Sequence, residues 1–106
     1  MRLVDLDPQF VKLESVYATN IAYEDVFDAT AAQGLEFTCP DHDHRVVCWF
    51  HGACVPDQVP PLGRWTPQGE DYDMMTLAEG PGGSREIALG CGWRGFITSG
   101  AITEAR

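Results

Sequence analysis

The sequence predicts a single small α+β domain, mostly antiparallel β, with one helix near residues 21–33. Three observations lead to this prediction. The chain has 106 residues, the length of one domain, and no repeat or linker divides it. Short runs of β-branched and aromatic residues alternate with turns that contain glycine or proline. Only one segment combines a helical spacing of apolar residues with a glycine after it. We therefore expect residues 1–106 to form one unit with a small core.

Two elements are expected before residue 34. Alternating apolar and polar side chains favour an extended segment from about Phe10 to Tyr17. The helix over 21–33 is predicted from an N-cap at Asn20, acidic residues in its first turn and Gly34 as the stop signal. Apolar side chains within this segment recur at the spacing of one helix face.

A pair of neighbouring strands is expected next. Residues 35–38 alternate in polarity, and residues 45–51 are dense in β-branched and aromatic side chains. The polar segment 39–44 between them is expected to form a short turn. Residues 52–71 contain several prolines and glycines. Because proline cannot continue a helix and lacks the N–H that a central strand needs, we expect an ordered, proline-rich surface loop over 52–71.

The last third of the chain is predicted to be β. Residues 74–77 and 85–89 favour strands on either side of a glycine-rich turn at 80–83. The clearest element is a hairpin over residues 95–104. Its two-residue loop, Ser99-Gly100, contains a glycine that can adopt positive φ, as tight hairpin turns require.

The charge of the chain excludes several partners. It has 16 acidic and 7 basic residues, and hence a net charge of −9. Nucleic acids are bound mainly through Lys and Arg, and the basic residues here form no run, so we reject direct DNA or RNA binding. An acidic surface favours a basic protein partner and is repelled by anionic membranes.

The chain is also expected to be cytoplasmic. Its N-terminal residues carry charge where a signal peptide has an apolar segment, and no apolar stretch is long enough to span a bilayer. Thiols stay reduced in the cytoplasm. The four cysteines are therefore expected to be metal ligands or buried apolar residues rather than two disulfides.

A cluster of metal-binding side chains lies in the turn at 39–44. Cys39 and His42 are three residues apart, a spacing that lets both bind one ion, and His44 adds a third donor. Cys91 is the best candidate for the fourth donor, because the glycines on both sides of it allow a tight turn. Cys48 is less suited, since it falls on the core face of its predicted strand. The alternative is a polar surface turn with a buried, apolar cysteine.

Other candidate groups favour structural interpretations. His51 and Cys54 are three residues apart, but they would need the distant Cys91 as a further donor. An acidic stretch lacks the oxygen-ligand pattern of a calcium loop, so a solvated surface is expected there. Its members are Glu70, Asp71 and Asp73. The tryptophans are expected to anchor the core or the loops, and they are Trp49, Trp65 and Trp93.

Four strings carry a resemblance to a known family: Leu35-Glu36-Phe37-Thr38-Cys39-Pro40, His44-Arg45-Val46-Val47-Cys48-Trp49-Phe50, Gly63-Arg64-Trp65-Thr66-Pro67 and Gly90-Cys91-Gly92-Trp93-Arg94-Gly95-Phe96-Ile97-Thr98-Ser99-Gly100. Over roughly residues 35–104 the chain resembles a family of small phage and prophage proteins of unknown function, often labelled ammonia monooxygenases. A membrane enzyme of that kind needs spanning helices, which this short acidic chain lacks.

The resemblance implies a zinc site. It matches Cys39 to the family's first cysteine, His44 to its histidine before the strand and Cys91 to its late cysteine. His42 replaces the family's second cysteine and keeps a zinc donor at that position. Two departures are evident: the insert before His44 is short, and Arg94 stands where the family has a histidine.

The predicted function is that of a phage-encoded accessory protein that binds a host protein in the bacterial cytoplasm. Four protein ligands leave no position for water on zinc, so the site is expected to be structural and the protein not to be an enzyme. Its acidity favours inhibition of a basic host factor that handles nucleic acid, such as a defence nuclease or a CRISPR complex. The alternative is a small zinc hydrolase or transferase with three ligands, in which Asp41, Asp43 or His51 is the general base. A virion or assembly component is a third interpretation.

Overall fold

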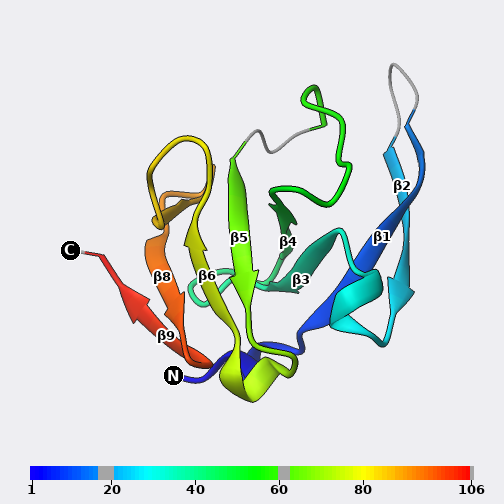
Figure 1. Cartoon of the computed structure of the whole chain (residues 1–106). Coiled ribbons are helices and arrows are strands. Elements are labelled where there is room, and N and C mark those ends of the chain that lie inside the picture. Colours follow the sequence, from blue (N-terminus) through cyan, green and yellow to red (C-terminus); the bar gives the residue numbers. More distant parts are fainter. Residues whose placement is uncertain (17–20, 60–62, 106) are drawn as a thin grey trace.

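The computed structural model describes residues 1–16, 21–59 and 63–105, which form two β-sheets (Figure 1). The strands are β1 (Gln9–Val16), β2 (Ile21–Val26), β3 (Gly34–Thr38), β4 (Arg45–Phe50), β5 (Arg64–Gln68), β6 (Thr76–Glu79), β7 (Ile87–Ala88), β8 (Arg94–Thr98) and β9 (Ala101–Glu104). A six-stranded sheet has the order β2-β1-β3-β4-β5-β6, and a three-stranded sheet has the order β7-β8-β9. Neighbouring strands are antiparallel except β4 and β5, which are parallel.

The helix predicted over 21–33 is wrong. The described residues contain no α-helix, only short 3-10 turns, which are η1 (Leu3–Leu6), η2 (Ala29–Ala31) and η3 (Tyr72–Met74). Residues 21–26 instead form β2, which pairs with β1. A helix of this length is marginal on its own, whereas pairing with β1 satisfies the same backbone groups and suits the β-branched and aromatic residues of β2. Phe27, part of the helical pattern, is 95% exposed, and the predicted cap Asn20 lies outside the described residues.

The β-strands expected on either side of the turn at 39–44 are confirmed. They are β3 and β4, which pair in an antiparallel register that sets Leu35 opposite Cys48. The hairpin near the C-terminus is confirmed as β8 and β9. Its loop residues Ser99 and Gly100 have φ of 47° and 77°, the pair of positive values that a type I′ turn requires.

The loop predicted over 52–71 is wrong at its C-terminal end, because residues 64–68 form β5 between β4 and β6. Pro67 is tolerated there for a geometric reason. The Trp65 carbonyl accepts a hydrogen bond from the His51 N–H at 2.7 Å, so residues 65 and 67 both direct their backbone groups toward the β4 side. β4 pairs only with residues 64 and 65, and the missing N–H of Pro67 therefore interrupts no ladder.

The remaining strand predictions hold with shifted ends. The expected extended segment is β1, although Tyr17 lies outside the described residues. The strand expected at 74–77 begins at Thr76, and the strand expected at 85–89 is reduced to β7. The turn between them is confirmed by a hydrogen bond from the Gly83 N–H to the Gly80 carbonyl at 2.9 Å.

The main core lies between the two sheets. It contains apolar residues from most strands, among them Phe10, Leu35, Phe37, Cys48, Phe50, Leu77, Ile87, Trp93 and Ile97. A smaller cluster forms around Trp49 with Val11 and Val59. All three tryptophans are buried, as expected. The sheets also exchange hydrogen bonds: the Gly100 N–H donates to the Met75 carbonyl at 2.8 Å.

Candidate metal centre

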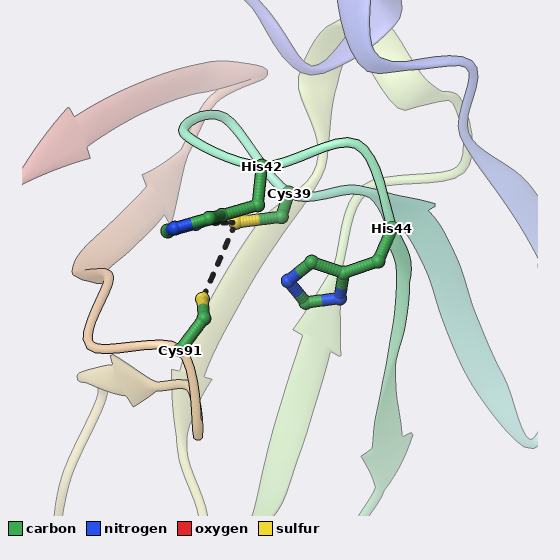
Figure 2. A group of neighbouring side chains, drawn as sticks. All are labelled: Cys39, His42, His44 and Cys91. Carbon is green, nitrogen blue, oxygen red and sulfur yellow. Dashed lines mark hydrogen bonds between the residues drawn. The ribbon is translucent and has the colours of Figure 1, made fainter.

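The candidate metal centre lies where a turn of one sheet meets a turn of the other. Cys39 directly follows β3 and His44 directly precedes β4, so both belong to the six-stranded sheet. Cys91 lies in the turn between β7 and β8 of the three-stranded sheet. Figure 2 shows the side chains of Cys39, His42, His44 and Cys91 directed toward one another. The structure thus brings together all four residues proposed as ligands.

Local sequence explains the shape of both turns. Pro40 has a fixed φ and no N–H, so it ends β3 directly after Cys39. A hydrogen bond from the Cys39 N–H to the His44 carbonyl, 2.9 Å long, closes the polar loop that carries His42. In the other turn Gly92 has φ of 101°, a conformation that favours glycine.

The distances between the donor atoms fit one tetrahedral ion. The Sγ atoms of Cys39 and Cys91 are 3.6 Å apart, and Cys39 Sγ lies 3.7 Å from His42 Nδ1. Tetrahedral zinc with ordinary bond lengths sets two sulfurs roughly 3.8 Å apart and a sulfur and a nitrogen roughly 3.6 Å apart. All four donor atoms lie within 4.8 Å of one another. Small side-chain movements therefore suffice to close the coordination shell.

Hydrogen bonds around Cys91 favour its thiolate, the form that binds metal. The Trp93 backbone N–H and the His44 side chain both donate to the sulfur, and they lower the pKa of Cys91 to about 7. Cys91 is exposed, so burial opposes this shift only weakly. With a pKa of about 7, about half of this thiol is therefore ionised at neutral pH even before a cation arrives.

Cys39 is in a different environment. It is 3% exposed, and burial raises the pKa of its thiol. The backbone N–H groups of Asp41 and His42 donate to the Cys39 sulfur and oppose that rise. A bound cation would supply the remaining stabilisation, since a metal deprotonates a coordinating thiol.

The N–H donors to sulfur are the part of the site that sequence reasoning missed. Both cysteines begin a turn whose later N–H groups point back to the sulfur, from Asp41 and His42 in one case and from Trp93 in the other. The signal available in the sequence was the residue after each cysteine. Pro40 and Gly92 are typical of turns that wrap the backbone around a thiolate.

The other candidate residues do not join the site. Cys48 is buried in the main core, which raises the pKa of its thiol. His51 and Cys54 are exposed and, among the described residues, belong to no group of three or more metal donors. The same holds for the exposed acidic residues Glu70, Asp71 and Asp73.

Comparison of the chain with protein-family models, with curated proteins and with solved structures gave no match. In the part of the chain that the structure describes, no helix is long and apolar enough to cross a membrane. The features that bear on function are therefore the donor cluster and the surfaces around it.

Proposed function

We propose that this chain is a zinc-binding, non-catalytic module that acts by binding another protein. The observation that supports the proposal is the convergence of two sulfur and two imidazole donors within 4.8 Å. Cys₂His₂ is a donor set typical of structural zinc, whereas magnesium and calcium prefer oxygen. When all four residues bind, no coordination position is left for water or a substrate, so the ion stabilises the fold and performs no hydrolysis.

The position of the site supports a structural role. Cys39 and Cys91 are 52 residues apart in sequence, and they come from turns of different sheets. A shared ion therefore cross-links the two halves of a chain whose core is small. In this proposal the residues Asp41 and Asp43 do not act as bases. They are exposed residues of the loop that carries His42.

The net charge of −9 supports a partner with a basic surface. We propose that the partner is a host protein that handles nucleic acid, such as a defence nuclease, if the chain acts in a phage-infected cell as its resemblance to phage proteins implies. Association with such a partner should slow steeply as salt is added, because screening weakens long-range attraction. An on-rate independent of salt would contradict the electrostatic part of the proposal.

Metal analysis of the purified chain tests the zinc site. We expect one zinc ion per chain, with X-ray absorption showing a shell of two sulfur and two nitrogen atoms. Cys39→Ser and Cys91→Ser should lose the ion, whereas Cys54→Ser, a matched change at an exposed cysteine, should retain it. A zinc-bound water in place of one protein donor would instead favour the hydrolase or transferase.

A further inference from the structure

An apolar pocket of about 350 Å³ lies beside the metal centre. One wall is formed by residues 44–49, which include His44 and most of β4. The facing wall is formed by residues 87–90, which include β7 and end directly before Cys91. Trp65 contributes a further apolar surface. The pocket thus separates the two strands that the candidate metal centre would join at one end.

The edge of β4 opens into this pocket. In the antiparallel ladder with β3, the backbone groups of Val46 and Cys48 point toward β3, so those of Val47 point the other way. β5 lies on that other side but pairs only with Trp49 and Phe50. Among the described residues, none forms a hydrogen bond with the Val47 backbone there.

The lining of the pocket agrees with an open edge. Residues from both faces of β4 line it: Cys48 belongs to the main core, and Trp49 belongs to the smaller cluster on the opposite face. Consecutive strand residues can line one pocket only where the strand edge itself faces it. Among the residues that the structure describes, β7 on the opposite wall also pairs on one side only. The Leu89 N–H pairs with the Trp93 carbonyl at 2.9 Å, so the backbone of Ala88 points away from β8.

We propose that an extended segment of a partner protein adds as a strand beside Val47 of β4 and places apolar side chains in this pocket. Such strand addition combines backbone hydrogen bonds with pockets for alternate side chains. This inference rests on the proposed function, because it identifies where the module binds its partner.

Charge defines the chemistry of the added strand. Arg45, the cation at this end of β4, is occupied inside the fold: its guanidinium donates to Glu36 at 2.9 Å and to the Asp7 carbonyl at 2.6 Å. The carboxylates of Asp41 and Asp43, in the turn before β4, are exposed. The segment that fits carries apolar residues at alternate positions and Lys or Arg at the end nearest this turn.

The test uses a random library of peptides about eight residues long, the length of a long strand. Selection on the zinc-loaded protein should enrich peptides with alternating apolar residues and a basic end. Methylation of the central peptide nitrogens should weaken binding of the enriched peptide at least about tenfold, because it removes backbone donors. Bound peptide should slow hydrogen exchange of the Val47 amide, while the Cys48 amide is protected with and without peptide.

A matched pair of variants locates the site. Ala88→Arg places a long side chain at the mouth of the pocket and should weaken peptide binding at least about tenfold. Met74→Arg adds the same charge at an exposed position of η3, outside the lining of the pocket, and should leave binding unchanged. Failure to enrich any peptide, or full binding by Ala88→Arg, would overturn the inference.

Zinc content and melting temperature, measured on the same samples, separate this inference from the proposed function. If the chain holds zinc but binds no peptide, the proposed metal centre stands and the strand-addition proposal is contradicted. A chain that holds no zinc contradicts the proposed function itself, whatever the peptides do.

Discussion

Replacing Cys91 with serine removes the one candidate metal donor that comes from the three-stranded sheet. With zinc bound, the ion links Cys91 to Cys39 across 52 residues of sequence. Treated as a cross-link that closes a loop of this length, the ion lowers the entropy of the unfolded chain. This adds about 4 kcal/mol to the free energy of unfolding at room temperature. A chain of 106 residues has an unfolding entropy of about 220 cal/mol/K. Loss of the link should therefore lower the melting temperature by about 18 °C.

Scanning calorimetry with and without a chelator measures this effect. Wild-type protein should melt lower after chelation by about the amount seen for Cys91→Ser, and the variant itself should not respond to the chelator. Cys54→Ser should behave like the wild type in both conditions, because Cys54 lies outside the donor cluster. If Cys91→Ser keeps both its zinc and its melting temperature, Cys91 does not bind a stabilising ion.

Three further changes test other parts of the structure. Gly100→Ala should destabilise the fold by more than about 1 kcal/mol in denaturant unfolding, because φ there is +77° and the new Cβ would overlap the Asp73 carbonyl. Burial, and then the hydrogen bond to Glu36, raise the pKa of Tyr23 from 10.0 to about 12. Between these values the unfolded chain loses the phenol proton and the folded chain keeps it, so stability should fall as pH rises from 10 toward 12. In zinc-free protein Cys91, with a pKa of about 7, should be alkylated by iodoacetamide with a rate midpoint near neutral pH.

Each of these changes has a matched control. Gly82→Ala should have little effect, since Gly82 has no positive φ and no atom within 4 Å of the added carbon. Tyr23→Phe should lose the decline in stability above pH 10, and an unchanged pH profile would assign the decline to another group. Zinc should block alkylation of Cys91, while the exposed Cys54 should react at the same rate with and without the ion.

The donor residues could be predicted because most of their chemistry is local. Cys39, His42 and His44 fall within one short turn between two strands, and that turn is readable from Pro40 and the β-rich segments beside it. The terminal hairpin was predictable for the same reason, since Gly100 marks a tight turn between two alternating segments. Cys91 was named from its neighbouring glycines and a family resemblance. Its approach to Cys39 is a property of the folded chain alone.

Two predictions failed where distant pairing outweighed local preference. The helix over 21–33 was predicted from apolar residues at helical spacing, but residues 21–26 pair with β1 in an antiparallel ladder that is interrupted by a bulge between Leu13 and Ser15. A short isolated helix has no comparable stabilisation. Pro67 argued against a strand, yet β5 places it where no partner strand needs its N–H. The strands that pair with β2 and with β5 cannot be identified from the residues of those two segments alone.

The amino-acid sequence alone determined which atoms can bind a metal and where the chain turns, because both depend on residues close together in the chain. The tertiary structure decided that the β3–β4 and β7–β8 turns meet, and that β4 and β7 line one pocket. Those features depend on the pairing of segments about fifty residues apart. Such pairing is set by how the whole core closes, and short-range preferences carry no information about it.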